Sequence, residues 1–466
     1  MTTTESPGPT GFFAGLLDPA NRADPYPIYD RMLAHGPVRL NGGPVVVLTS
    51  HRDCATVLRH PGAVVDRRHA AIPLGPTPTY DLAGERAREL AGVTSFLFRD
   101  APDHTRLRRL VAKAFTPAVV RGMAPRITAI AEAALDRAAE RGRLDIVADL
   151  AYPLPITVIC ELLGVPLEDE PRLREWSTML ARTLDPVSGA ATERRPDPGE
   201  LVRANNELHD YFEQLIRVRR ARPGADLLTA LLAAEESGDA LSHEEVIATC
   251  GLLLTAGHET TVNLISNAVL ALLRHPAHLD TLHTAPEFAG PVVEETLRYD
   301  PPVQLVPRVA STPIPLPGID IAPGDFVVML IAAANHDPAV FPDPSRFDPT
   351  RESRHLAFGL GLHFCLGAPL ARLEADIALT RFARRVIAPR LDCAQPPYRE
   401  HVTLRGPASI PLSYREIRPG YRRFMSAARS AVSMVREPPA KASAAWDRSA
   451  ASAWPAPHAS LTMTGR

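Results

Sequence analysis

Apolar residues recur at helical spacing along most of the chain. Residues 103–222 follow this pattern, and one segment places apolar side chains at i, i+3, i+4, i+7 and i+8: Ile127, Ile130, Ala131, Ala134 and Leu135. Prolines break the pattern around residues 152–155 and 185–198, and the polar stretch 187–200 is expected to be a surface loop. Shorter helices are predicted at residues 25–34, 287–300 and 366–388. The chain is therefore predicted to be mainly helical.

A smaller part of the chain has the composition of strands. Residues 38–40 and 45–48 flank Asn41-Gly42-Gly43, a sequence that favours a tight hairpin turn. Further strands are predicted at residues 306–310, 319–321 and 325–330. The predicted fold class is α+β, mainly α with a small β subdomain.

One helix is predicted to be much longer than the others, from about Ser242 to Arg274. Ser242 and Glu245 have the spacing of a capping box, and Pro276 ends the helix. Residues 250–256 are nearly all apolar, so this helix is expected to be buried on most sides.

The centre of the long helix carries residues that a core helix does not need. Gly257-His258-Glu259-Thr260 follows the apolar run directly. Glycine in a helix interior costs about 1 kcal/mol relative to alanine, and a buried glutamate must be neutral, paired or solvated. Several unfavourable choices at one place indicate a functional site.

Composition and charge narrow the class of protein. With 466 residues the chain has room for about three domains of ~150 residues, although one large domain is equally allowed. Hydrophobic residues make up 45% and charged residues 22%, which excludes wholesale disorder and a fibrous repeat. The net charge of −2 argues against a dedicated nucleic-acid binder. No apolar run reaches 18 residues and the start has no basic, apolar leader, so the expected location is cytoplasmic.

The five cysteines are isolated from one another, and only one has an unusual setting. No C-x-x-C pair exists among Cys54, Cys160, Cys250, Cys365 and Cys393, which argues against a disulfide scaffold, a zinc ribbon and an iron–sulfur cluster. Cys365 follows two glycines and precedes a predicted helix. Exposed backbone N–H groups and the positive end of that helix favour a thiolate there, either as a nucleophile or as a metal ligand.

The segment around this cysteine resembles the haem-binding loop of the cytochrome P450 family. The family's F-G-x-G-x-H-x-C-x-G is matched by Phe358-Gly359-Leu360-Gly361-Leu362-His363-Phe364-Cys365-Leu366-Gly367. The resemblance implies that haem b, iron protoporphyrin IX, is the cofactor and that Cys365 is its axial iron ligand. Phe358, Gly359 and Gly367 would contact the haem, and O2 would be a co-substrate. It also implies the P450 fold, with the long helix lying over the haem.

A second stretch resembles the E-x-x-R motif of the same family. Glu295 and Arg298 are three residues apart, which places both side chains on one helix face. The family resemblance implies a third partner, for which Arg346 is the candidate. A network of Glu295, Arg298 and Arg346 would hold the cysteine loop in place and would be structural, not catalytic.

The centre of the long helix resembles the family's A-G-x-[DE]-T-T. The resemblance implies that Ala256 and Gly257 open a groove for dioxygen through a local distortion of the helix. Glu259 and Thr260 would deliver the protons needed to break the O–O bond. As an alternative, the Thr260 hydroxyl bonds to the carbonyl four residues earlier, as threonine often does in helices.

Four residues match positions that bind the two haem propionates in the family. They are His104, Arg108, Arg308 and His355. Each could also be an ordinary surface residue. Arg106 and Arg109 lie on other faces of the same predicted helix as Arg108 and are candidates for contact with an acidic redox partner.

The resemblance covers residues 20–417 and leaves the two ends unexplained. Residues 1–19 are expected to be flexible, and residues 418–466 to be a disordered basic, Ala/Ser/Pro-rich tail with eight basic residues against two acidic ones. A surface helix within the tail is the alternative.

The family resemblance implies a bacterial-type haem-thiolate monooxygenase. It would insert one oxygen atom of O2 into a small, largely apolar substrate by hydroxylation or epoxidation, in secondary metabolism. The chain lacks a dinucleotide fingerprint, so a separate ferredoxin and an NAD(P)H-dependent ferredoxin reductase are expected to supply electrons to a monomeric enzyme. Aryl coupling or desaturation at the same haem is the main alternative. A haem sensor or a peroxygenase is disfavoured, because neither needs Glu259 and Thr260.

Overall fold

The computed structural model describes residues 9–72, 95–181, 197–235 and 241–420. The predicted surface loop lies outside the described residues except for its last four, of which residues 198–200 open a helix. Nearly all of the predicted tail also lies outside them.

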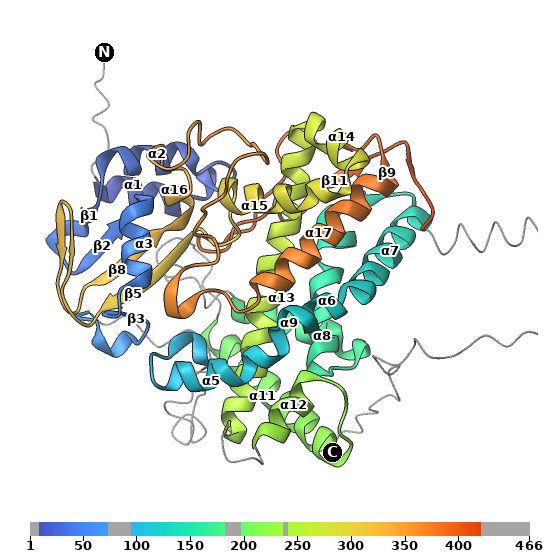
Figure 1. Ribbon diagram of the computed structural model, residues 1–466, viewed down its shortest axis with the longest axis horizontal. Helices are drawn as coiled ribbons and strands as arrows, with labels where there is room; N and C mark the ends of the chain where they lie inside the picture. The colour runs from blue at the N-terminus through green and yellow to red at the C-terminus, as the bar shows by residue number, and fades with distance from the viewer. Residues whose placement is uncertain (1–8, 73–94, 182–196, 236–240, 421–466) are drawn as a thin grey trace, which may run out of the picture.

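Helices dominate the described part of the chain, as predicted (Figure 1). They are α1 (Pro9–Leu17), α2 (Tyr26–His35), α3 (His51–Arg59), α5 (Asp103–Ala112), α6 (Pro117–Gly122), α7 (Ala124–Arg141), α8 (Pro153–Leu163), α9 (Glu170–Ala181), α11 (Pro198–Ala221), α12 (Leu227–Glu235), α13 (His243–Arg274), α14 (Pro276–Thr284), α15 (Ala289–Tyr299), α16 (Ile331–Ala334) and α17 (Ala368–Arg385).

The strands form one mixed sheet and three small ones. The main sheet has the order β1-β2-β8-β5-β3. Its strands are β1 (Val38–Arg39), β2 (Val45–Leu48), β3 (Ala63–Val64), β5 (Leu305–Ala310) and β8 (Phe326–Leu330). The predicted hairpin is confirmed, with Val38 opposite Val47 in an antiparallel pair. The smaller sheets pair β4 (Leu144–Asp145), β10 (Arg390–Leu391) and β11 (Pro411–Ser413), β9 (Val386–Ile387) with β12 (Glu416–Ile417), and β6 (Ile314–Leu316) with β7 (Ile319–Ile321).

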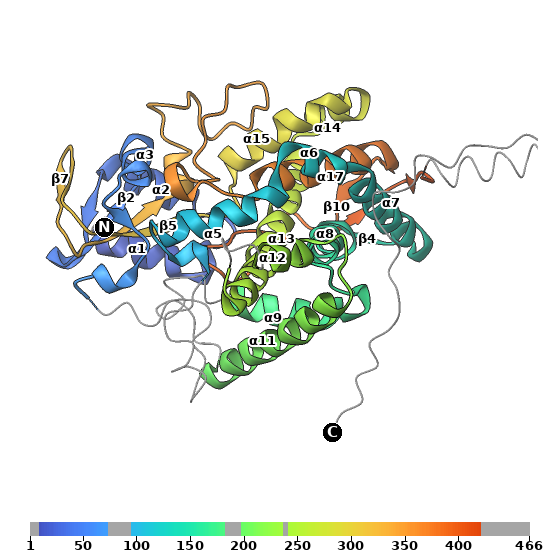
Figure 2. The ribbon, with the colours of Figure 1, turned by 60° about the horizontal axis from the view of Figure 1, so that its bottom comes forward.

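The main sheet and the helical bundle occupy different sides of the molecule. Figure 1 shows the sheet together with α1, α2, α3 and α16 on one side and α6, α7, α8, α14 and α17 on the other. Figure 2 shows α9 and α11 lying next to each other, in agreement with their mutual packing. These positions leave the centre to a single long helix.

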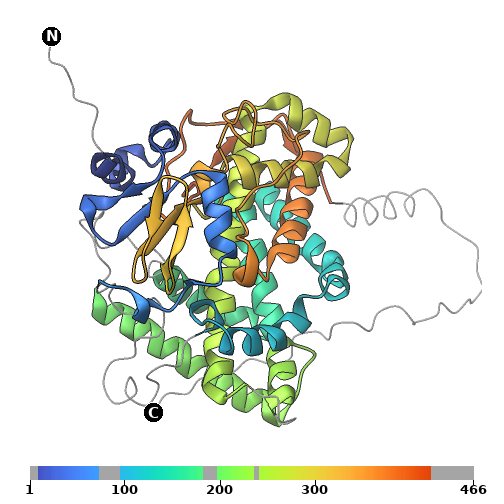
Figure 3. The ribbon, with the colours of Figure 1, turned by 60° about the vertical axis from the view of Figure 1, so that its left-hand side comes forward.

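That central helix is α13, which runs through the middle of the molecule (Figure 3). Its predicted bounds are confirmed. Ser242 caps it with a complete capping box: the Ser242 hydroxyl accepts from the Glu245 N–H, and the Glu245 carboxylate accepts from the Ser242 N–H. It packs against α8, α9, α11, α15 and α17. Burial on nearly every side explains its apolar sequence.

The expectation of a flexible start over residues 1–19 is wrong for the part that the structure describes. Helix α1 spans Pro9–Leu17, and its Phe12 and Leu16 side chains are buried. They join Ile28 and Met32 of α2 in one apolar cluster. Phe12 and Leu16 are four positions apart and therefore lie on one face of a helix. This spacing was the available sequence signal for α1, and the prediction did not use it.

A buried glutamate of α17 forms no ion pair with any residue that the structure describes. Glu374 is buried, and its Oε2 has no hydrogen-bond partner among the described residues. Burial raises the pKa of Glu374 to about 8. The folded protein therefore holds this side chain as the neutral acid at neutral pH.

We expect Glu374 to make the free energy of unfolding depend on pH. The folded pKa of about 8 lies above the ordinary value of 4.5. The contribution of Glu374 to the free energy of unfolding is thus fully present below pH ~4.5. It is lost as the pH rises towards 8, and the free energy of unfolding falls by up to about 1.4 kcal/mol per pH unit. Glu374→Gln should reduce the loss of stability between pH 5 and pH 8, measured by chemical unfolding. The exposed Glu352 supplies the control Glu352→Gln; equal slopes for wild type and Glu374→Gln would contradict the prediction.

Candidate active site

Cys365 lies at the end of a tight loop that the two glycines make possible. Gly359 and Gly361 have φ angles of 68° and 69°, the left-handed region that L side chains rarely adopt. A Cβ at Gly361 would lie 2.8 Å from the Leu58 carbonyl oxygen, so a larger residue could not pack there against the end of α3. The Cys365 N–H donates to the Phe358 carbonyl at 2.8 Å and closes the loop.

The start of α17 lies immediately after the cysteine. Burial raises the pKa of the Cys365 thiol, whereas the backbone N–H groups of Gly367 and Ala368 and the charge of Arg108 act in the opposite direction. The predicted stabilising groups are therefore present, but burial outweighs them. Arg108 also donates to the Phe364 carbonyl at 2.5 Å, which ties α5 to the cysteine loop.

The predicted pair of Glu295 and Arg298 is present and fully buried on α15. Arg298 donates to both Glu295 carboxylate oxygens at 2.8 Å. It also donates to the backbone carbonyls of Asn335, Pro344 and Arg346. One guanidinium therefore holds the long irregular segment that leads to the cysteine loop.

Arg346 is not the third member of this network, which corrects the prediction. Its side chain is 70% exposed and lies 3.8 Å from Asp348. The side chain of Arg351, only 12% exposed, lies 3.3 Å from the Glu295 carboxylate instead. Arg346 contributes only its carbonyl oxygen.

From Val246 to Leu272 the surface of α13 is buried except at the predicted oxygen site. Between Val246 and Leu272 only Ala256, Gly257 and Thr260 are not buried. A Cβ at Gly257 would meet Ile159 of α8 at an ordinary distance of 3.7 Å, so packing alone does not require glycine. The helix is continuous from His243 to Arg274, and the expected distortion is not observed.

Glu259 and Thr260 make different contacts although they are adjacent. The Thr260 hydroxyl donates to the Ala256 carbonyl at 2.9 Å, which is the alternative considered for this residue. The Glu259 carboxylate is buried, forms an ion pair with Arg399 and accepts from the Thr178 hydroxyl at 3.3 Å. Burial by itself raises the pKa of Glu259, but His258 and Arg399 lower it, and the net direction is below the ordinary value. Glu259 is therefore a carboxylate at neutral pH.

His258 is fully buried and lies on the side of α13 that faces α9. Its Nδ1 is 3.5 Å from the Ser177 hydroxyl and 3.4 Å from the Leu254 carbonyl. Burial lowers the pKa of His258, so its imidazole is neutral at pH 7. It is not part of the exposed window.

Two of the predicted propionate ligands, His104 and Arg308, lie in one cluster with a residue that was not predicted. His104 is buried, and neither of its ring nitrogens has a hydrogen-bond partner in the described part of the chain. The His363 ring lies 4.3 Å from it, and Asp100 is 3.8 Å from His363. Burial, together with the charges of His363 and Arg108, lowers the pKa of His104 to about 4. Burial lowers the pKa of Arg308 to about 10, so the guanidinium stays charged.

His355 lies in a different place from the other three candidates. Its Nε2 is 3.2 Å from the Glu294 carboxylate, which also forms an ion pair with Arg372 at 2.6 Å. Burial raises the pKa of Glu294, but hydrogen bonds from His355 and Arg372 bring it down to about 2. The His355 ring therefore already pairs with a carboxylate of the protein, that of Glu294.

His363 and Arg351 are the two site residues that sequence reasoning missed. His363 stands two positions before the cysteine within the matched loop, and this motif position was the available signal. Arg351 follows Arg346 by five residues in a segment of turns. No periodicity indicates side-chain direction in such a segment.

Comparison with known proteins agrees with this geometry. The family model described as Cytochrome P450 matches residues 37–285 and 287–397. The chain is 39% identical over 420 residues to the cytochrome P450 monooxygenase PikC of Streptomyces venezuelae, covering 88% of this chain and 95% of the relative. It is 39% identical over 407 residues to vitamin D(3) 25-hydroxylase of Pseudonocardia autotrophica, covering 84% and 94%.

A solved structure shows the same fold. Ligand-free CYP164A2 of Mycobacterium smegmatis superposes with a TM-score of 0.78 at 48% sequence identity, covering 86% of this chain and 99% of that one. The chain therefore belongs to the cytochrome P450 family. It is an oxidoreductase of the monooxygenase class.

The family's cofactor is a haem with an axial thiolate, and the residues present fit it. A Cβ at Gly367 would meet no protein atom within 4 Å, so the polypeptide leaves room beside Cys365 for another group. The orphaned ring nitrogens of His104 are hydrogen-bonding groups that a buried anion would satisfy. Arg308 is buried and forms no ion pair among the described residues, which also suits an anionic propionate.

Proposed function

We propose that this protein inserts one oxygen atom of O2 into a small, largely apolar organic substrate, as a monomer, by hydroxylation or epoxidation. The observation that carries the proposal is the partly exposed window of Ala256, Gly257 and Thr260 on a helix that is otherwise buried from Val246 to Leu272. Small residues and one hydroxyl are what a dioxygen site needs. The haem, when bound through Cys365, supplies the redox chemistry that cleaves the O–O bond.

In this proposal the polypeptide has two tasks around the haem. Cys365 would ligate the iron, and His104, His363, Arg108 and Arg308 would hold the propionates. The imidazoles would donate hydrogen bonds, and the guanidinium groups would supply charge. His355 is replaced by His363 in this set, because His355 already pairs with Glu294.

Protons reach the oxygen site through Glu259 and Thr260 in this proposal. Thr260 lies in the window and Glu259 lies next to it inside the packed core. The carboxylate exchanges protons with its surroundings, and the threonine hydroxyl passes them on once it leaves the Ala256 carbonyl.

Replacing Thr260 by alanine tests this function. Thr260→Ala should lower the product formed per NAD(P)H by about 10-fold or more and release hydrogen peroxide, because protons no longer arrive in step with electrons. Thr261→Ala is a matched control, since the Thr261 hydroxyl bonds in the same way to Gly257 but is buried outside the window. Unchanged coupling in Thr260→Ala would remove Thr260 from proton delivery.

Substrate identity is open to a direct screen. By family position, residues 303–306 and 408–410 would face the substrate, and Leu305 and Ile410 of these segments are buried. The relatives are named a vitamin D(3) 25-hydroxylase and a monooxygenase. We propose an apolar substrate body on this basis. A library screened for the spectral change on displacement of the iron-bound water reports binding without a redox partner.

Electrons come from a ferredoxin and its NAD(P)H-dependent reductase in this proposal. Leu362 and Phe364 of the cysteine loop are 45% and 39% exposed, which is unusual for large apolar residues in this chain. They favour docking of the electron donor over the cysteine. Arg109 is exposed and remains a candidate contact. Arg106 is engaged within the chain by Glu245 at 2.5 Å.

A further inference from the structure

The Glu259 carboxylate is held by a residue that neither α13 nor its neighbouring helices supply. Arg399 comes from the loop of residues 398–407 near the end of the described chain and forms an ion pair with Glu259 Oε2. The other carboxylate oxygen accepts from Thr178 of α9 at 3.3 Å. Both oxygens of the proposed proton donor are therefore engaged by Arg399 and Thr178, whereas the Thr260 hydroxyl bonds to the Ala256 carbonyl.

The loop that carries Arg399 is fixed by its own backbone. Tyr398 and Pro407 form a β-bridge, and the Arg399 N–H donates to the Gly406 carbonyl at 3.2 Å. The buried Arg405 forms an ion pair with Asp300 at 2.6 Å, which anchors the loop beyond the end of α15. Arg399 therefore extends from a rigid support.

The same loop is docked directly on α13. The Asn267 side chain donates to the carbonyls of Arg405 at 3.3 Å and of Asp300 at 2.9 Å. A Cβ at Gly406 would lie 2.2 Å from Asn263 Oδ1, so glycine is needed for this close approach. Glu259, Asn263 and Asn267 follow one another at intervals of four and form one polar stripe along the helix. The loop covers this stripe along its length.

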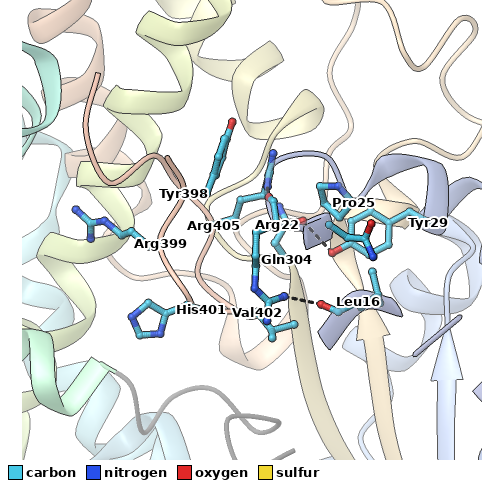
Figure 4. A pocket seen from close by; sticks show the side chains of 11 residues that line it. Leu16, Arg22, Pro25, Tyr29, Gln304, Tyr398, Arg399, His401, Val402 and Arg405 are labelled. Carbon is cyan, nitrogen blue, oxygen red and sulfur yellow. Dashed lines mark hydrogen bonds between the residues drawn. The ribbon is translucent and has the colours of Figure 1, made fainter. Parts of the chain in front are cut away.

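Arg399 also lines a cleft between the loop and the region of α1 and α2 (Figure 4). In Figure 4 the guanidinium of Arg399 points away from Arg22 and Tyr29, which line the opposite wall. The Arg399 side chain is 18% exposed, so it links solvent to the buried carboxylate.

The other ionisable groups around Glu259 are few. His258 of the same helix places its Nε2 3.5 Å from Glu259 Oε1, and His401 belongs to the loop. On the α9 side Arg174 lies over the Tyr152 ring at 3.8 Å. Burial makes His258 neutral, and burial raises the pKa of Tyr152 far above neutrality. Arg399 is thus the cation in direct contact with Glu259.

We propose that Arg399 is a positioning residue for proton delivery: its ion pair holds Glu259 as a carboxylate that is not bonded to Thr260 and so sets the pH range in which Glu259 supplies protons. The inference rests on the proposed function of the Glu259–Thr260 pair. Without Arg399, burial would dominate and Glu259 would take up a proton near neutral pH. The loop that carries Arg399 would then no longer set the protonation state of Glu259.

Infrared spectroscopy of the haem-loaded protein tests the inference without turnover. Arg399→Gln should add one protonated carboxyl C=O band at pH 7 that is absent in wild type, and the band should disappear in the Arg399→Gln/Glu259→Gln double variant. Its titration midpoint should lie about one to three pH units above that of Glu259 in wild type. Arg399→Lys keeps the charge and should show no new band. Arg415→Gln, an exposed arginine, is the control.

The pH profile of coupling supplies the second readout. With a ligand from the spectral screen, the pH dependence of product formed per NAD(P)H should shift upward in Arg399→Gln and return in Arg399→Lys. No new band, or a band that survives Glu259→Gln, would overturn the inference. A new band with an unchanged pH profile would also overturn it, whereas failure of the proposed function would appear separately as unchanged coupling in Thr260→Ala. Arg399→Met serves as a second uncharged variant if Arg399→Gln does not fold.

Discussion

Replacing Cys365 by histidine should abolish the strongly red-shifted Soret band that the ferrous carbon monoxide complex of the wild type is expected to show. The shift arises when a thiolate is the axial ligand, and the structure offers one cysteine in position to be that ligand. Cys54, Cys160 and Cys250 are buried elsewhere in the core. Cys365 is the one that ends the glycine loop and precedes α17.

The measurement separates loss of the ligand from loss of the cofactor. Haem content is determined in the same samples, so a variant that keeps haem but loses the shift shows a change of ligand. Cys393→Ser is the matched control, because Cys393 is also partly exposed but lies after α17, outside the loop. It should leave the band unchanged. A wild-type protein with an unshifted band would exclude Cys365 as the thiolate ligand.

Local signals in the sequence were enough to predict the elements that carry the site. The bounds of α13 follow from an apolar run, a capping box at Ser242 and a proline at position 276, all of which act within a few residues. The pairing of Glu295 with Arg298 follows from the fixed direction of side chains three positions apart on a helix. Such relations need no knowledge of distant parts of the chain.

Partners across irregular segments could not be predicted in the same way. Asp343 has a φ angle of 48°, so the chain reverses direction shortly before Arg346 and Arg351, and spacing cannot show which side chain turns inward. Gly359 and Gly361 likewise redirect the chain between His355 and His363. The Arg399–Glu259 ion pair joins residues 140 positions apart, and neither partner carries a local sign of the other.

The buried pair on α15 should be the largest single contribution to stability near the site. Arg298→Leu should lower the free energy of unfolding by about 3–5 kcal/mol, because it leaves the Glu295 charge buried without its main partner. It also removes the donor that three backbone carbonyls share, those of Asn335, Pro344 and Arg346. Since these carbonyls belong to the segment before the cysteine loop, we expect the variant to lose haem as well as stability.

Two arginine variants show whether the network is assigned correctly. Arg351→Gln removes a mostly buried cation 3.3 Å from Glu295 and should destabilise the protein by about 1–3 kcal/mol. Arg346→Gln changes an exposed side chain but keeps the backbone carbonyl that accepts from Arg298. This substitution should change the free energy of unfolding by no more than about 0.5 kcal/mol. Urea unfolding followed at the haem Soret band and by circular dichroism measures both. Equal effects of the two variants would contradict the placement of Arg351, because only one of the two guanidinium groups lies close to the Glu295 carboxylate. If only Arg351→Gln weakens haem retention, then the network acts on the cysteine loop through that guanidinium and not merely through general stability.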